Sequence, residues 1–497
     1  MRINLTVTSK GRQFDRLASL YLGDTEIFRT STAEPTPNGI VWTYIKDLSP
    51  YNVLWKHPQK VLLDLGNVIT DVYTGPFDVV VTAHFSHENN TRTADVILPI
   101  SAKKSASNSP SAFQLPSDNA TTNYTIPASA SRAILSISAC GQSDEEFWWS
   151  NVFSSDTDTF SSSYGQLYGY SSFREVQAYV DGSLAGVVWP FPVIFTGGVA
   201  PGLWKPIVGI DAFDLRQPEI DISPFLPLLT DGNDHSFEIR VAGLDVSEGD
   251  RTVKLTESVG SYWVVTGTIF LYLDQNPPSN SNKSVEVFAP APIFNFTRNL
   301  VQNQTGGNES LSYSVTVDRT FSVSSSHFSW LQNLSFSNSG LYDQQGFNQE
   351  NQQLTSGQSS AAQIGKSGKP SQVAFEYPLS ANQTYGTSSD VTTIDASVER
   401  GLHITDTGEP WISTYTFTSG PSSQHTNQHG KAHYESGSGG QYTSSGDTTV
   451  DFESNAGSKD YERHVRAING SVVSDTDSPR KTSLSFGQIR VPETGVH

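Results

Sequence analysis

The sequence predicts an all-β protein built as two consecutive jelly-roll-like β-sandwich domains followed by a third β-rich C-terminal domain. Short apolar runs bounded by Gly, Asp and Pro recur along the chain, which is typical of strands. No helical period of 3.6 residues persists beyond about two turns. The 39 glycines and 26 prolines, together with abundant Ser, Thr and Asn, favour turns between short strands. A length of 497 residues accommodates about three such domains.

We expect the first sandwich to span residues 1–128. Its predicted strands are residues 1–7, which alternate polar and apolar side chains, and the apolar runs Leu17–Leu22, Val61–Leu65 and Phe77–Ala83. Residues 101–131 are rich in Ser, Asn, Ala, Pro and Thr. This composition predicts an exposed linker.

The second sandwich is predicted for residues 129–275, beginning with the strand Arg132–Ser138. Asp274–Asn280 contains two prolines and breaks the chain again. The third domain, residues 283–497, is predicted to carry strands at Leu311–Val317 and Gln372–Tyr377 among Ser/Gly/Gln/Thr-rich segments.

Composition excludes several functions. The net charge is −19 and charged residues are only 16% of the chain, so binding to nucleic acid or to an anionic membrane is disfavoured by repulsion. No apolar stretch reaches the roughly 18 residues that a membrane span needs. Cys140 is the single cysteine, so the chain cannot form an internal disulfide; it is either a buried thiol or half of a pair whose partner lies in an absent segment.

The first residues resemble a strand and not a signal peptide, so we expect that an upstream leader is missing from this sequence. We also expect the protein to be secreted. Eleven Asn-x-Ser/Thr sequons support passage through the secretory pathway, where we expect several to carry glycans. They are Asn4, Asn89, Asn119, Asn123, Asn282, Asn295, Asn303, Asn308, Asn333, Asn382 and Asn469.

Three short segments place carboxylates beside aromatic or cationic residues: the Asp15-Arg16 pair at the entrance to a strand, residues 28–35 with Arg29 and Glu34, and Asp144–Trp149. Sugar sites use this combination, because rings stack on pyranose faces while acids bond to hydroxyls. Apolar neighbours also raise the pKa of a carboxyl group, as acid/base catalysis at mildly acidic pH requires. A turn aspartate, a solvated acidic loop and a core pair of Trp148 and Trp149 are the structural alternatives.

Residues 189–206 form a Pro/Gly-rich loop that carries Trp204 and Lys205, and such loops often hold binding residues. A packed Trp204 is the alternative. His84 with His87, and His425 with His429 and His433, are spaced like metal ligands, but their Ser/Gly-rich surroundings favour solvated loops. No metal-binding, phosphate-binding or serine-hydrolase motif is present, so the sequence indicates neither metal nor nucleotide.

At these segments the sequence resembles the acidic peptide:N-glycanase family of plants and fungi. The resemblance rests on residues 13–18, 28–35, 145–151, 173–177, 189–198 and 204–215, and it covers about residues 1–275. It implies hydrolysis of the amide that links the first GlcNAc of an N-glycan to Asn, giving Asp and a glycosylamine. It implies N-glycopeptides or N-glycoproteins as substrates and no cofactor, and it allows an upstream segment or a cleaved chain of the same protein as a partner.

The resemblance also implies roles for single residues. A more distant bacterial glycanase has a catalytic aspartate in an aromatic-Asp-Arg segment, which matches Asp15, and a second site acid before an aromatic residue, which matches Glu146. The position of its remaining acid matches Ala83 here, so that role is lost or passes to Glu34.

Arg16, Arg29, Trp148, Trp149, Trp204 and Lys205 are the expected substrate-binding residues. The missing acid at Ala83 is the best support for one alternative to the amidase, a glycan-binding protein that does not cleave. A further alternative is a glycosidase that leaves one GlcNAc on Asn.

Overall fold

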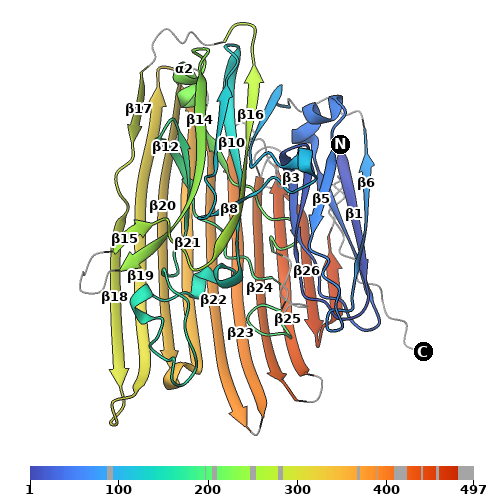
Figure 1. Ribbon diagram of the computed structural model, residues 1–497, viewed down its shortest axis with the longest axis vertical. Coiled ribbons are helices and arrows are strands. Elements are labelled where there is room, and N and C mark those ends of the chain that lie inside the picture. Colours follow the sequence, from blue (N-terminus) through green and yellow to red (C-terminus); the bar gives the residue numbers. More distant parts are fainter. Residues whose placement is uncertain are drawn as a thin grey trace.

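The computed structural model describes residues 1–86, 93–195, 197–203, 210–246, 253–277, 284–365, 370–388, 390–407, 422–437, 440–454 and 458–478. Almost all regular structure in these residues is β-strand, which confirms the all-β prediction. Figure 1 shows three units in chain order: a first unit in blue, a second in cyan and green, and a third in yellow to red.

The first unit is a sandwich of two three-stranded antiparallel sheets. One has the order β4-β1-β6 and the other β3-β2-β5. Alternate residues of β1, such as Ile3 and Leu5, are buried against Leu20 and Phe28 of the opposite sheet. The strands are β1 (Arg2–Ser9), β2 (Leu17–Leu22), β3 (Thr25–Ser31), β4 (Ile40–Asp47), β5 (Val61–Leu65) and β6 (Phe77–His84). The four strands predicted for this unit are therefore confirmed.

The second unit is a sandwich of two five-stranded sheets. One has the order β13-β10-β16-β7, with β8 also paired to β16; the other has the order β12-β11-β14-β15, with β9 also paired to β14. The strands of the first sheet are β7 (Val96–Ile100), β8 (Phe113–Leu115), β10 (Ala130–Gln142), β13 (Glu219–Asp221) and β16 (Tyr262–Leu273). Those of the second are β9 (Thr121–Thr125), β11 (Glu175–Val180), β12 (Ser183–Val188), β14 (Asp234–Val246) and β15 (Val253–Thr256).

Strand pairing differs from the predicted division of the chain at one place. β7, β8 and β9 lie within residues 1–128 but pair with β16 and β14 of the second unit. The predicted exposed linker, residues 101–131, buries Phe113, Leu115 and Ile126 in the core of that unit. The linker prediction was wrong because it rested on the Ser/Asn-rich composition of this segment. Its buried apolar residues occur singly and do not form the apolar run that predicts a strand.

The third unit is one antiparallel meander of eleven strands in a single sheet, with β18 paired beside β17 on β19. The strands are β17 (Val285–Phe288), β18 (Ile293–Gln302), β19 (Asn308–Ser325), β20 (Phe328–Asp343), β21 (Asn348–Gln363), β22 (Ser371–Ser388), β23 (Val391–Thr407), β24 (Ser422–Glu435), β25 (Gln441–Ser454), β26 (Ser458–Ile468) and β27 (Ser471–Asp477). Its long strands run along most of the molecule in Figure 1. The two strands predicted here are confirmed as parts of β19 and β22.

Helical segments are short, and no helix in the described residues is long and apolar enough to cross a membrane. They are the helix α2 (Leu226–Leu229) and the 3-10 turns Ser49–Lys56, Ser105–Ser107, Ser143–Glu145, Trp148–Ser150, Ser154–Asp156, Ser223–Phe225 and Gln344–Gly346.

Buried ion pairs, and the hydrogen bonds that their charged groups make, join the three units. Between the first and second, Arg29 forms a bidentate pair with Glu26 at 2.7 and 2.8 Å and donates to the carbonyl oxygen of Val264 on β16. Between the second and third, Arg319 of β19 pairs with Glu175 of β11 at 2.7 Å. Such pairs are costly to break, because removing one partner leaves an uncompensated buried charge. They hold the units in fixed register.

Candidate active site

Three of the predicted site residues, Asp15, Glu34 and Glu146, come together where the first unit meets the second. Asp15 lies in the loop that enters β2, Glu34 follows β3, and Glu146 follows β10. The charge of Asp15 acts on the carboxyl groups of both glutamates. We call these three residues the acidic cluster.

Both glutamates have a raised pKa. Burial, followed by repulsion from Asp15, raises the pKa of Glu34 from 4.5 to about 7, and the same two causes raise the pKa of Glu146 to about 7. Desolvation disfavours the ionised form of a carboxyl group, and a nearby negative charge adds to that effect. At mildly acidic pH the acidic cluster therefore holds two protonated carboxyl groups beside Asp15.

The loop that carries Asp15 is fixed by Gln13 and by the backbone of Arg16. Buried Gln13 donates from Nε2 to the carbonyl oxygens of Val68 and Gly75. The Arg16 N–H donates to Oγ1 of Thr32 at 2.8 Å, and the Thr32 N–H donates back to the Arg16 carbonyl oxygen at 3.0 Å. Because Thr32 is two residues before Glu34, this reciprocal pair ties the Asp15 loop to the Glu34 segment.

Glu146 is positioned by its neighbour Glu145. The buried Glu145 carboxylate accepts two hydrogen bonds from Arg174, at 2.6 and 2.7 Å, and one each from Nε1 of Trp263 and the N–H of Gly260. Burial alone would raise the pKa of Glu145, but these four donors and the Arg174 charge hold it below its ordinary value. Glu145 is therefore a structural anchor, and Glu146 is the carboxyl group that reaches the cluster.

The close fit of this turn depends on Gly141. A Cβ atom at Gly141 would lie 2.3 Å from the carbonyl oxygen of Glu145, so only glycine lets the end of β10 pass the Glu145 turn.

Two glycines of the 189–206 loop pack against Glu34 of the acidic cluster and against Phe147. Gly197 has φ +78°, and a Cβ there would lie 3.0 Å from Oε1 of Glu34. A Cβ at Gly198 would lie 3.1 Å from Cε1 of Phe147, next to Glu146. The loop thus approaches Glu34 and Phe147, the residue after Glu146, with its backbone.

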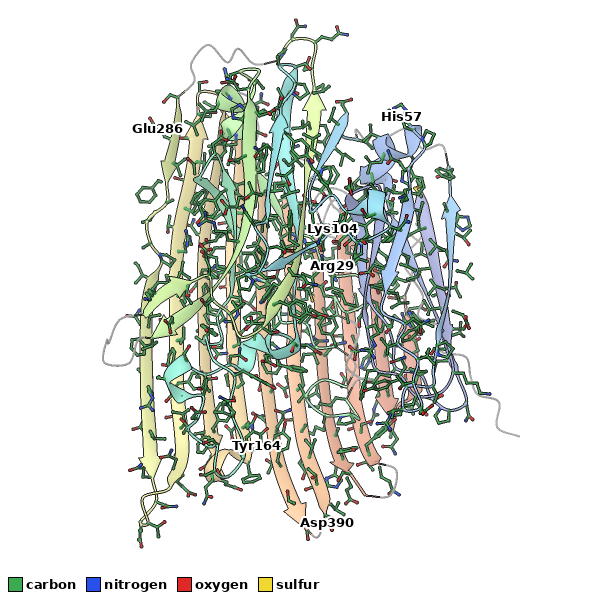
Figure 2. All side chains as sticks on the ribbon, viewed as in Figure 1. Arg29, His57, Lys104, Tyr164, Glu286 and Asp390 are labelled. Atoms are coloured by element: carbon green, nitrogen blue, oxygen red, sulfur yellow. The ribbon has the colours of Figure 1, made fainter. Side chains whose placement is uncertain are left out.

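Arg16 and Arg29 occupy different positions. Arg16 is half-buried next to the cluster, where its Nη2 donates to Oε1 of Gln13 and its guanidinium lies 5.7 Å from the Tyr73 ring centroid. Arg29 is 1% exposed between the first and second units (Figure 2) and is bonded to Glu26 and Val264 as described above. The prediction that Arg29 binds substrate is therefore corrected, because its buried guanidinium is paired with Glu26.

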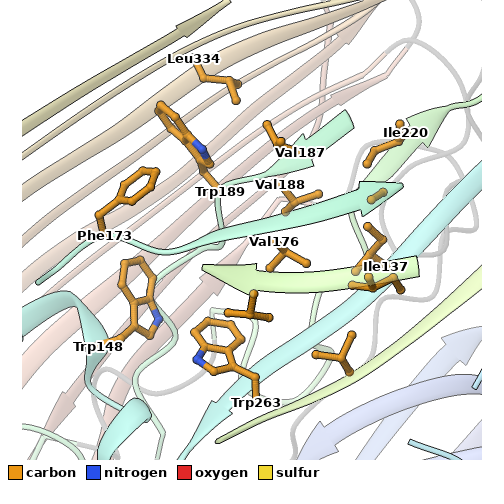
Figure 3. Close-up of a cluster of buried hydrophobic side chains, with 14 of the residues drawn as sticks. Ile137, Trp148, Phe173, Val176, Val187, Val188, Trp189, Ile220, Trp263 and Leu334 are labelled. Atoms are coloured by element: carbon orange, nitrogen blue, oxygen red, sulfur yellow. The ribbon is translucent and has the colours of Figure 1, made fainter. Parts of the chain in front are cut away.

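Trp148 and Trp149 lie in the hydrophobic core of the second unit, 4% and 3% exposed. Figure 3 shows Trp148 among Phe173, Trp189 and Trp263. The prediction that these two rings line a sugar cleft is corrected to the core pair, because their apolar area is packed against other buried rings. Trp204 and Lys205 lie outside the described residues, so their predicted role stays a prediction.

The position matched to the third acid of the bacterial glycanase lies at the surface of the first unit. Ala83 is exposed on the edge strand β6, paired with Ile3. Glu34, the alternative candidate, lies in the acidic cluster with Asp15.

Cys140 is a buried thiol on β10 whose pKa is raised to about 12, mainly by burial.

His84 ends β6, and His87 lies outside the described residues. His425, His429 and His433 lie on strand β24 and not in a loop, which corrects that prediction; β24 is paired on both sides, with β23 and β25. Among the described residues no group of three or more His, Cys, Asp or Glu side chains could hold a metal ion.

Nine of the eleven sequons fall on described residues. Asn119, Asn123, Asn295, Asn333 and Asn469 are exposed, whereas Asn4, Asn303, Asn308 and Asn382 are partly buried. Asn89 and Asn282 lie outside the described residues.

Comparison with known proteins places this geometry in a family. Residues 1–289, which contain the whole acidic cluster, match the family model described as peptide N-acetyl-beta-D-glucosaminyl asparaginase amidase A, and residues 312–379 match the PNGase_A C-terminal domain. The peptide-N4-(N-acetyl-beta-glucosaminyl)asparagine amidase A of Prunus dulcis is 35% identical over 294 residues, covering 56% of this chain and 48% of the relative. The chain thus spans about half the length of that curated relative.

Solved structures add little. One described as "Structure of PNGF-II in C2 space group" has a TM-score of 0.35 and 11% identity, covering 56% of this chain and 58% of that chain. A second crystal form of the same protein gives a TM-score of 0.34 at 12% identity. These values are too low to support an argument. The family-model match, which covers more than half of the chain, confirms the resemblance seen in the sequence: the chain belongs to the peptide N-acetyl-beta-D-glucosaminyl asparaginase amidase A family.

Proposed function

We propose that this chain is a peptide:N-glycanase, which hydrolyses the amide bond between the innermost GlcNAc of an N-glycan and the Asn of a glycopeptide or glycoprotein. One observation carries the proposal: in a chain of this family, Asp15, Glu34 and Glu146 gather at the junction of the two sandwiches, and two of them have a pKa of about 7. Perturbed carboxyl groups of this kind are typical of catalytic sites.

The reaction needs one proton acceptor and one proton donor. Water adds its oxygen to the carbonyl carbon of the Asn side chain, and a base takes the proton that the water loses. The C–N bond then breaks, and an acid protonates the departing nitrogen, so the products are Asp and the glycosylamine.

The charges in the cluster suit these two tasks. Burial and the Asp15 charge raise the pKa of both glutamates, so Glu34 and Glu146 keep their protons up to about pH 7. In this assignment Asp15 takes the proton from water, while Glu34 and Glu146 donate hydrogen bonds to the amide and protonate the leaving nitrogen. Arg16, half-buried beside Asp15, contacts the substrate.

Secretion and work at acidic pH belong to the same proposal. The raised pKa values favour activity below pH 7, and the exposed sequons offer sites for glycans. Expression through a secretory pathway followed by mass measurement of each sequon peptide tests the second point, and unmodified sequons would argue against it.

The direct test is incubation of the protein with a defined N-glycopeptide at about pH 5, near the ordinary carboxyl pKa values, in water enriched in heavy oxygen. We expect a peptide in which Asn has become Asp with one heavy oxygen, and a released intact glycan. A peptide that keeps one GlcNAc would indicate a glycosidase. Tight binding of an unchanged glycopeptide would indicate a glycan-binding protein.

A further inference from the structure

Residues 189–195 and 197–203 of the 189–206 loop lie between the acidic cluster and the C-terminal sheet. On one side Gly197 packs against the carboxyl group of Glu34 and Gly198 against Phe147. On the other side, strands of the third unit contact the same loop at four separate points. A shift of the sheet would therefore move this loop and, through it, change the surroundings of the Glu34 carboxyl group.

The first two contacts hold the start of the loop. Phe191 packs edge-on against Tyr377 of β22, with ring centroids 5.2 Å apart. Arg400 of β23, 3% exposed, lies under Phe191, with its guanidinium 5.9 Å from that ring, and its Nη1 lies 3.5 Å from the carbonyl oxygen of Pro192.

The other two contacts hold the end of the loop, close to the acids. Gln383 of β22 donates from Nε2 to the carbonyl oxygen of Val199 at 2.6 Å. Gly202 packs so tightly on the sheet that a Cβ there would lie 3.0 Å from Cδ2 of Tyr442 and 3.2 Å from Cβ of Ala432.

The backbone conformation of Val199 is unfavourable, and the hydrogen bond from Gln383 helps to hold it. Val199 has φ +64°, a left-handed conformation that is unfavourable for a β-branched residue. Such residues persist where the surroundings enforce them, and they cluster at functional sites. The hydrogen bond from Gln383 ends on this residue, two positions from Gly197.

We infer that the C-terminal sheet is part of the catalytic apparatus, and that Gln383 is a positioning residue which holds the 189–206 loop against Glu34. The inference rests on the proposed amidase function. It assigns a task to the third unit, which contributes no carboxyl group to the acidic cluster.

A single substitution tests this. Gln383→Leu keeps the volume of the side chain, removes the donor to Val199 and leaves the Asn382 sequon intact. Gln352→Leu is the matched control, because exposed Gln352 of the neighbouring strand β21 donates a comparable hydrogen bond to Oγ of Ser380 on β22 and does not contact the loop. Gln383→Asn, which keeps the amide on a shorter side chain, is a milder variant in case the leucine prevents folding.

We expect Gln383→Leu to lower kcat by about tenfold while KM changes by less than about twofold, because small displacements of catalytic groups cost rate more than binding. Water admitted to Glu34 lowers the pKa of that carboxyl group, so the loss of activity at rising pH moves to a lower pH. Gln352→Leu is expected to match the wild type in all three quantities. Unchanged kcat and pH profile in Gln383→Leu would overturn the inference.

A second readout does not depend on turnover. Hydrogen exchange of the amides at residues 197–203 is expected to speed up in Gln383→Leu and not in Gln352→Leu. Unchanged exchange would show that Gln383 does not hold the loop, whatever the activity. An inactive wild-type protein with faster exchange in Gln383→Leu would instead refute the proposed function and leave the contact between loop and sheet standing.

Discussion

Glu145 and Glu146 are adjacent in the chain, yet they belong to two different kinds of region. Glu145 is one of the buried acids that pair with arginine, together with Glu26 and Glu175. These pairs anchor strands, and the pair of Glu175 with Arg319 joins the second and third units. Glu146 belongs to the acidic cluster, where burial and the charge of Asp15 are the causes of its raised pKa. The difference teaches that burial alone does not mark a functional acid; the sign of the neighbouring charge decides between anchor and catalyst.

The largest effect is expected from Asp15→Asn, which removes the charge that organises the cluster. We expect activity on an N-glycopeptide to fall by roughly 10²- to 10⁴-fold, the usual contribution of a general base. Thermal unfolding should be unchanged or occur at slightly higher temperature, because Glu34 and Glu146 lose a repulsive neighbour. Near-normal turnover would remove Asp15 from the mechanism.

The pair Glu145→Gln and Glu146→Gln tests the comparison within two adjacent positions. Glu145→Gln leaves the buried Arg174 without its counter-charge and should lower the free energy of unfolding by about 3 to 5 kcal/mol. Glu146→Gln should keep the stability and lose most of the activity. Denaturant unfolding and glycopeptide turnover, measured on both variants, would contradict the assignment if the two phenotypes were exchanged.

Arg29→Met separates an interface role from a substrate role. Loss of the guanidinium leaves the buried Glu26 carboxylate without its counter-charge. We therefore expect the free energy of unfolding to fall by about 3 kcal/mol. KM of the surviving folded protein should stay near that of the wild type. A raised KM with unchanged stability would restore Arg29 as a substrate-binding residue.

The last prediction is a pH dependence of stability. Between about pH 4.5 and 7 the folded chain keeps protons on Glu34 and Glu146 that the unfolded chain has released. Stability therefore falls as pH rises through this window. The double variant Glu34→Gln/Glu146→Gln should have a flatter profile in thermal unfolding between pH 5 and pH 7, and an identical slope in both proteins would be evidence against the raised pKa values.

Sequence patterns predicted much of this fold and part of the site. Strands with strict alternation or continuous apolar runs, such as β1 and β2, were predicted at nearly their observed limits. β8 and β9 were missed because they are short and carry isolated apolar residues inside a polar segment. The long polar strands β21 and β24 of the third unit were also not predicted, because their Gln, Ser and Thr side chains give them the composition of a loop.

The resemblance to the family brought out Asp15, Glu34 and Glu146, and the aromatic residue after Glu146 separated it from Glu145. The anchoring role of Glu145 was not predicted, because it depends on Arg174 and Trp263, which approach from distant positions in the chain. Gln383 was missed for the same reason, as its partner Val199 lies 184 residues away.

The most direct test of the account is a crystal structure of the Asp15→Asn variant with a bound N-glycopeptide. The account predicts the Asn-linked amide at the acidic cluster, with its carbonyl oxygen or nitrogen within hydrogen-bond reach, about 3 Å, of a carboxyl group of Glu34 or Glu146. A glycopeptide bound elsewhere, with its amide remote from all three positions, would contradict it.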